Sequence, residues 1–137
     1  IGYELGRIFG NELKNSRFFN HIDLIVPVPL HPRKQRQRGY NQSEWIARGM
    51  AESMQKSLDI KSLYRTVDTE SQTNKTKYDR WKNVENIFAV KYPETLIGKH
   101  VLIVDDVITT GSTLEACAAA IHNLEGTRVS AATLAMA

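Results

Sequence analysis

The sequence has little of several things, and each shortage excludes a class of protein. Its 137 residues include a single cysteine, Cys117, which excludes an internal disulfide and a cysteine-based zinc site. No apolar run approaches the ~20 residues that cross a bilayer, and residues 1–10 lack the basic-then-apolar order of a signal peptide. The four histidines show no metal-ligand spacing. We therefore expect a cytoplasmic chain without membrane contact, forming one domain over residues 1–137.

Positive charge is concentrated in one place. The net charge is only +3, but the stretch HPRKQRQRGY, residues 31–40, holds four basic residues and no acid. The rest of the chain carries 14 basic and 15 acidic residues. A local basic cluster of this kind favours an anionic ligand over a surface coated with nucleic acid.

Alternating helical and strand-like segments predict an α/β fold with a mostly parallel central sheet flanked by helices and a long flexible loop. Within an N-terminal helical segment, residues 1–20, apolar residues at helical spacing predict an amphipathic helix over residues 3–16 with Leu5, Ile8, Phe9 and Leu13 on one face. Asn41, followed by Glu44 in a capping-box spacing, opens a second helix to about Leu58. A third helix follows residue 113 and stops at Gly126. Strands are expected over residues 23–29, 63–67, 86–90, 100–106 and 128–137.

Two connecting segments stand out. The basic stretch, residues 31–40, is expected to form a loop. The polar, aperiodic stretch over residues 68–83 is too long for a simple connection, and such loops are usually lids or binding loops.

The stretch VLIVDDVITTGST, residues 101–113, predicts a ligand site. Its unalternating apolar run favours a central parallel strand buried on both faces, and Asp105 and Asp106 lie at its carboxyl end, where open α/β sheets bind ligands. The hydroxyl-rich turn that follows opens a helix, whose first N–H groups bind phosphate readily. Carboxylates beside a phosphate site suit a phosphorylated sugar, because carboxylate oxygens accept hydrogen bonds from the sugar hydroxyls. The alternative is a helix cap next to a solvated acid pair.

This stretch resembles the phosphoribosyl pyrophosphate (PRPP) signature of the type I phosphoribosyltransferases. Residues 26–47 (VPVPLHPRKQRQRGYNQSEWIA) and 71–88 (SQTNKTKYDRWKNVENIF) extend the resemblance to the ComF/GntX, competence-protein subgroup. Members of that subgroup usually begin with a cysteine-rich zinc-binding segment, which is lacking here. The resemblance implies the type I phosphoribosyltransferase fold.

The resemblance also implies residue roles. Asp105 and Asp106 would bind the ribose hydroxyls. Arg33 and Lys34 are the first choices for the pyrophosphate and Arg36 and Arg38 the second, with a solvated basic loop as the alternative. Mg²⁺ would be held mainly by PRPP, with water-mediated contacts to the two aspartates. In the flexible loop, Arg80 would close on the pyrophosphate and Asn83 would hold the base of the loop itself in place. The 5′-phosphate would lie against Thr109, Thr110, Gly111, Ser112 and Thr113.

The implied reaction is displacement of pyrophosphate from C1 of PRPP by a nitrogen nucleophile from an unknown acceptor. No catalytic residue can be assigned, and His31 is better explained by a structural role. A second hypothesis is a non-catalytic PRPP- or nucleotide-binding adaptor of the ComF type in DNA uptake. Single-stranded DNA would then contact Arg36, Arg38 and Tyr40, and a competence helicase would be a partner. A regulatory PRPP sensor is a third hypothesis, and a homodimer is a further expectation.

Overall fold

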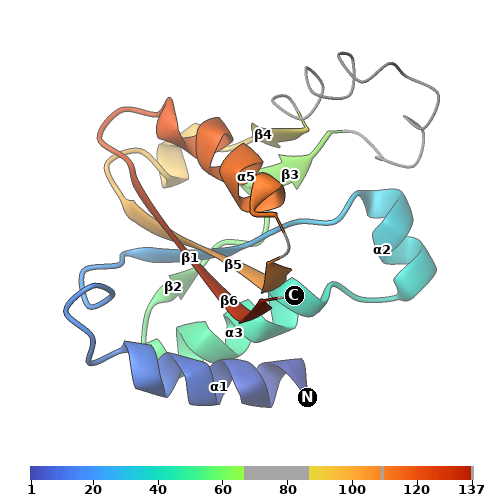
Figure 1. Cartoon of the computed structure of the whole chain (residues 1–137). Coiled ribbons are helices and arrows are strands. Elements are labelled where there is room, and N and C mark those ends of the chain that lie inside the picture. Colours follow the sequence, from blue (N-terminus) through green and yellow to red (C-terminus); the bar gives the residue numbers. More distant parts are fainter. Residues whose placement is uncertain (67–86, 109, 137) are drawn as a thin grey trace.

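A parallel sheet with strand order β2-β1-β5-β6 organises the chain in the computed structural model, which describes residues 1–66, 87–108 and 110–136 (Figure 1). Its strands are β1 (Leu24–Pro27), β2 (Ser57–Leu58), β5 (His100–Ile108) and β6 (Arg128–Met136). All three pairings between neighbouring strands are parallel. The predicted α/β fold with a mostly parallel sheet is therefore confirmed.

Strand β5 lies inside this sheet, between β1 and β6. Val101 and Ile103 pack into the core on one face, while Leu102 and Val104 pack into the core on the other, and all four are fully or almost fully buried. This arrangement confirms the prediction of a central strand buried on both faces. The strand continues to Ile108, two residues past the predicted end, because β6 pairs with it that far.

Helices cover both faces of the sheet. On one face lie α1 (Gly2–Leu13) and α3 (Gln42–Met54), and on the other lies α5 (Ser112–His122). A separate antiparallel pair, β3 (Leu63–Arg65) with β4 (Phe88–Val90), packs on the α5 side, and a short 3₁₀ helix, η2 (Pro93–Thr95), leads on to β5 (Figure 1). The first predicted strand, residues 23–29, is shorter than expected at both ends, since β1 spans Leu24–Pro27.

The predicted buried face of the first helix is only partly correct. Phe9 and Leu13 pack against the core, but Leu5 and Ile8 are 43% and 58% exposed. The buried positions of α1 are instead its glycines, Gly2, Gly6 and Gly10. A Cβ on Gly6 would lie 2.1 Å from the Ile46 carbonyl oxygen of α3. The glycines thus let two helix backbones pack closely, which apolar periodicity alone does not reveal.

Other element boundaries also differ from the predictions. The first helix ends at Leu13 instead of residue 16, and the third ends at His122, before the predicted stop at Gly126. The second helix ends at Met54 instead of Leu58, because Gln55 adopts a left-handed conformation (φ 57°) that stops the helix. The basic stretch is not a plain loop but contains α2 (Pro32–Arg38). His31 begins this helix by accepting a hydrogen bond from the Arg33 N–H at Nδ1 (3.1 Å), and Gly39 ends it with φ 81°.

The segment predicted as a flexible loop, residues 68–83 with Arg80 and Asn83, lies outside the described residues, as does Thr109. On either side of that segment, Thr66 donates from its N–H and its hydroxyl to the Ile87 carbonyl oxygen, at 2.6 and 2.8 Å. Within the described part of the chain, no helix has both the length and the apolar character needed to cross a membrane.

Candidate functional site

The two aspartates lie where the strand order of the sheet changes direction. From β1 the chain adds β2 on one side, and β5 with β6 lies on the other, so β1 and β5 border the switch point at which open α/β sheets bind ligands. Pairing between β1 and β5 ends at Pro27 and Val104, followed by one bond from the Val28 N–H to the Val104 carbonyl oxygen (2.8 Å). Asp105 is therefore the first β5 residue beyond the β1 pairing. From this residue on, β5 lies next to the segment that follows β1 instead of next to β1 itself.

Hydrogen bonds hold both carboxylates in place. Asp105 Oδ1 accepts from Ser43 Oγ and from the Asp106 N–H, each at 2.9 Å, and Asp106 Oδ1 accepts from the Val107 N–H at 2.8 Å. Burial raises the pKa of Asp105 above its ordinary value, although the hydrogen bonds from Ser43 and the Asp106 N–H oppose the rise and the Asp106 carboxylate adds to it. The two neighbouring carboxylates therefore carry an electrostatic cost that a hydroxyl-rich or cationic ligand would relieve.

The amino end of α3 delivers Ser43 to this carboxylate. Asn41 is 7% exposed, and its Oδ1 accepts from the Ser43 N–H at 3.1 Å, which confirms the predicted cap. Its Nδ2 donates to the Val28 carbonyl oxygen at 3.1 Å, which fastens the helix start to the end of β1. Glu44, the other half of the predicted capping box, pairs with Arg48 Nε at 3.2 Å. The cap is thus real, and its function is to align α3 with the aspartates.

A cavity of about 160 Å³ lies over the aspartates. Two arginines that are distant in sequence line it, Arg38 at the end of α2 and Arg65 on β3. Arg65 also lies over the Phe88 ring, 5.0 Å from its centroid, so it is held against the hairpin. Such a volume lies below the ~300 Å³ lower end of small-molecule pockets, and encloses only part of a ligand as large as PRPP. The remaining lining residues are Val28, Pro29, Leu30, Asn41, Gln42, Ser43, Asp105, Asp106 and Thr113.

The turn before α5 forms a second, adjoining hollow of about 20 Å³ beside Asp105 and Thr113. Gly111 has φ 82° and starts α5 without any side-chain cap, since glycine has none to offer. Thr110 Oγ1 lies 2.9 Å from Ser112 Oγ and 3.3 Å from the Ser112 backbone nitrogen. Hydroxyl groups and the start of an 11-residue helix therefore border the cavity that the two arginines also line.

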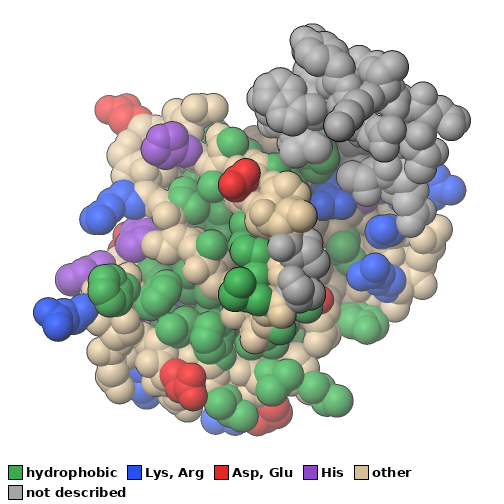
Figure 2. Space-filling view, viewed as in Figure 1, with side chains coloured by type: hydrophobic (Ala, Val, Ile, Leu, Met, Phe, Trp, Pro, Cys, Tyr) green, Lys and Arg blue, Asp and Glu red, His purple; other side chains and the backbone are tan. Residues whose placement is uncertain are grey.

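The predicted residues divide into two groups. Asp105, Asp106 and Thr113 line the cavity, and Thr110 and Gly111 border the adjoining hollow. The basic residues Arg33, Lys34 and Arg36 belong to α2 but do not line it, and Tyr40 is 51% exposed. Several Lys and Arg side chains lie at the right of Figure 2, where Figure 1 places α2, and others lie at the left.

Sequence reasoning missed Ser43 and Arg65, and ranked Arg38 behind Arg33 and Lys34. Ser43 lies two residues after a helix cap, and Arg65 is one basic residue in a short strand, so neither carries a local signal. Only the fold brings them to Asp105, which is 62 residues from Ser43.

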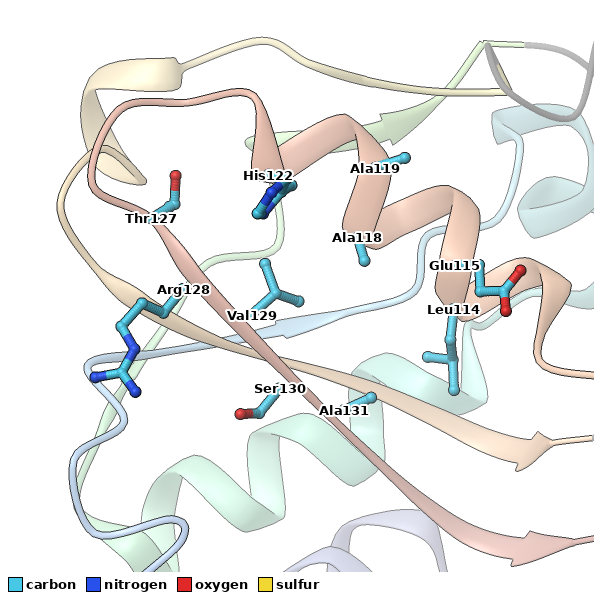
Figure 3. Close-up of a pocket in the computed structure, with 10 residues that line it drawn as sticks. All are labelled: Leu114, Glu115, Ala118, Ala119, His122, Thr127, Arg128, Val129, Ser130 and Ala131. Carbon is cyan, nitrogen blue, oxygen red and sulfur yellow. The ribbon is translucent and has the colours of Figure 1, made fainter.

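A larger cavity, about 680 Å³, lies elsewhere, between α5 and the edge strand β6 (Figure 3). It is lined largely by small and apolar side chains, and none of the residues predicted to bind PRPP takes part. Volume alone therefore does not identify the site, and the acids, arginines and helix start favour the smaller cavity.

The donor set near the aspartates suits a magnesium ion that is held mainly by its ligand. Among the described residues, no three His, Cys, Asp or Glu side chains come together to bind a metal unaided. Hydrogen bonds from Ser43 Oγ and from the N–H groups of Asp106 and Val107 fall on Oδ1 of the two aspartates. Carboxylate oxygens of this kind accept from water molecules around Mg²⁺, which keeps several waters when it binds phosphates.

Comparison with known proteins decides the family. Residues 5–137 match the family described as "Phosphoribosyl transferase domain". The chain belongs to the type I phosphoribosyltransferase family. Its relatives include ComF-like proteins: it is 36% identical over 117 residues to the DNA utilization protein YhgH of Escherichia coli K12 and 32% identical over 122 residues to Competence protein F of Haemophilus influenzae. Each alignment covers 83% of this chain, but the chain spans about half the length of these curated relatives, 51% and 52%.

Solved structures confirm the fold of this phosphoribosyltransferase domain. An allosteric regulatory enzyme of purine biosynthesis superimposes with a TM-score of 0.59 at 17% identity, covering 94% of this chain and 25% of that one. A hypoxanthine phosphoribosyltransferase from Staphylococcus aureus gives 0.53 at 14% identity, covering 98% and 62%. At such identities the likeness establishes the fold alone.

Proposed function

We propose that the chain binds PRPP at the cavity over Asp105 and Asp106 and acts as a phosphoribosyltransferase on an acceptor still to be found. The observation that carries this proposal is the convergence on one cavity of two carboxylates, two arginines and the uncapped start of α5. A sugar with phosphates at both ends has the matching charge pattern, with hydroxyls in the middle and anions on either side.

Each part of the cavity has a distinct task in this proposal. Asp105 and Asp106 accept hydrogen bonds from the ribose hydroxyls, and binding these hydroxyls relieves the repulsion between two neighbouring acids. Thr110, Gly111 and the first N–H groups of α5 hold the 5′-phosphate. Arg38 and Arg65 hold the pyrophosphate through the planar fork of guanidinium groups.

The reaction requires cleavage of the bond between C1 and the pyrophosphate oxygen as a nitrogen nucleophile attacks C1. The chain contributes by fixing the sugar at both ends and by neutralising charge that develops on the departing oxygen. Bound Mg²⁺ would add charge neutralisation on the same pyrophosphate oxygens. No protein group needs to form a covalent bond in this reaction, and Cys117 is buried and does not line the cavity.

Calorimetry with PRPP in the presence of Mg²⁺ tests the binding step. The Asp105→Asn, Asp106→Asn double variant should lose PRPP binding while its unfolding transition stays cooperative. Unchanged affinity in that variant would refute the site. Turnover is tested separately by following pyrophosphate release with a panel of nucleobases and amines, and the matched control is the same panel with the double variant.

A second candidate function is binding of single-stranded DNA as a non-catalytic adaptor. Relatives named for DNA utilization and competence favour it, together with the exposed basic helix α2. Because Arg38 also lines the PRPP cavity, Arg36→Gln with Arg33→Gln is the cleaner probe of α2. Oligonucleotide affinity should fall with salt under this hypothesis, and it falls further in that variant only if the strand binds at α2.

A further inference from the structure

A second surface of the molecule combines lysines with exposed aromatic rings. Lys61, Tyr64, Lys91 and Tyr92 line a shallow cavity of about 540 Å³ at the β3–β4 hairpin. All four side chains are exposed, with Tyr64 at 43% and Tyr92 at 37%. Large aromatic side chains are usually buried in a core, so two that share a cavity with two cations need a reason.

Strand geometry sets this surface apart from the PRPP cavity. Side chains alternate along a strand, and Leu63 on β3 and its partner Val90 on β4 point into the core. Arg65 shares their side of the hairpin and lines the cavity over the aspartates. Tyr64 therefore points to the opposite side, where its cross-strand partner is the small Ala89. The small partner leaves one side of the Tyr64 ring uncovered.

Hydrogen bonds fix the backbone that carries these side chains. The Lys91 N–H donates to the Ser62 carbonyl oxygen at 2.7 Å, which extends the hairpin by one residue. The Asp59 carboxylate accepts from the N–H groups of Lys61 and Ser62 at 2.9 Å each, and from the hydroxyls of Ser62 and Thr95. Together these bonds lower the pKa of Asp59, although burial opposes them. The hydrogen bonds of Asp59 thus go to the turn, and among the described residues it forms no ion pair with Lys61 or Lys91.

The two lysines and two tyrosines place positive charges next to flat aromatic rings on one surface. The Lys91 ammonium lies 5.5 Å from the centroid of the Tyr92 ring, a cation–π distance. No salt bridge joins Lys61 or Lys91 to an acid among the described residues. A ligand with alternating anions and flat rings would match two ammonium groups beside two rings.

We propose that this Lys61–Tyr64–Lys91–Tyr92 surface binds single-stranded nucleic acid, with bases stacked on the tyrosines and phosphates at the lysines. Every base presents a flat face and every nucleotide a phosphate, so the contact tolerates sequence changes. Duplex DNA keeps its bases inside the stack, so it offers phosphates to the lysines but no free base faces to the tyrosines. The inference rests on the second function proposed above, to which it assigns a surface other than α2.

The test is fluorescence anisotropy of a labelled 15-nucleotide dT strand over a range of salt concentrations. Replacing Lys61→Gln and Lys91→Gln together should weaken binding and reduce the slope of log affinity against log salt by about 1.4, since each phosphate contact to a single strand contributes ~0.7. Tyr64→Ala and Tyr92→Ala should each weaken binding at least about fivefold, whereas the Phe variants, which keep the ring, should stay near the wild-type affinity.

Controls separate this inference from the broader function. Arg33→Gln with Arg36→Gln removes the same charge from α2 and should leave most binding intact. If binding is lost in that variant but survives the lysine and tyrosine changes, the strand binds at α2 and the inference is wrong while the DNA function stands. If the wild type binds no strand, both are wrong. If thymidine monophosphate binds as tightly as the dT strand, the surface does not read a strand and the inference is wrong as well. The affinity of each variant for PRPP serves as a check that the variant is folded.

Discussion

At the scale of single residues, this structure places titratable groups in environments that change their chemistry. Asp105 is the clearest case, because its carboxylate is partly buried beside another acid and rests on hydrogen bonds from Ser43 and the Asp106 N–H. A group whose pKa is raised by folding takes up a proton more readily in the folded state than in the unfolded one. Folding stability therefore falls as the pH rises through the window above the ordinary pKa of an aspartate, and the cost persists at neutral pH.

Asp105→Asn should stabilise the protein without ligand at pH 7 while weakening PRPP binding at least tenfold, about 1.4 kcal/mol. Asparagine retains an oxygen that can accept from Ser43 Oγ and the Asp106 N–H, but has no charge to bury. Urea unfolding at pH 7 and pH 3 measures the first effect, and the advantage over wild type should shrink at the lower pH. A variant that is less stable than wild type at pH 7 would contradict the argument.

Cys117 gives a second prediction at this scale. It is fully buried on α5, and burial raises its pKa to about 12, so almost no reactive thiolate forms at ordinary pH. A thiol reagent at pH 8 should label the native protein roughly a thousandfold more slowly than the urea-unfolded chain. Labelling should accelerate with urea in step with unfolding. Rapid stoichiometric labelling of the native protein would show that the helix opens locally.

At the scale of whole elements, the contact between α1 and α3 depends on glycines. Gly6 and Gly10 of α1 face Ile46, Met50 and Ser53 of α3, and a Cβ on Gly49 would lie 2.1 Å from the Tyr3 carbonyl oxygen. The glycines lower intrinsic helix propensity, and packing of the two helices offsets that cost.

Gly6→Ala should destabilise the protein by about 1–3 kcal/mol, because the new methyl group would overlap the Ile46 carbonyl, a backbone atom that cannot rotate away. In an exposed helix the same change stabilises by up to ~1 kcal/mol. Gly2→Ala is the matched control, since its Cβ would meet only the flexible end of Gln42 at 3.2 Å. Urea midpoints for the two variants measure the difference, and equal midpoints would disprove close backbone packing.

Elements that depend on a strong local pattern could be predicted, and those that depend on distant partners could not. The run from Val101 to Val104 indicated a central strand because every residue in it is apolar, and Asn41 indicated a helix start because its side chain bonds within two residues. The face of α1 was misjudged because glycine has no hydropathy signal. Helix α2 was missed because its residues have no apolar face, and its limits are set by His31, Pro32 and Gly39.

At the scale of the whole molecule, the candidate site exists only through the order of strands in the sheet. The switch between β1 and β5 brings the segment after β1, the start of α3, the end of β5 and the turn before α5 to one edge. The aspartates and the turn could be predicted because they are adjacent in sequence. The bond from Ser43 to Asp105 and the approach of Arg65 required the complete fold, because the segments that carry them meet only across the sheet and the hairpin.

A ligand that bridges these segments should therefore stabilise the whole chain. PRPP with Mg²⁺ at a concentration 100 times its Kd should raise the free energy of unfolding by about 2.7 kcal/mol, since it binds the folded state alone. The urea midpoint as a function of PRPP concentration measures this effect. Ribose 5-phosphate, which lacks the group expected at Arg38 and Arg65, should stabilise less at equal concentration, and chelating the magnesium should remove most of the effect of PRPP. An equal shift with ribose 5-phosphate would mean that the arginine side of the cavity contributes nothing, and no shift with PRPP at millimolar concentration would remove the proposed function itself.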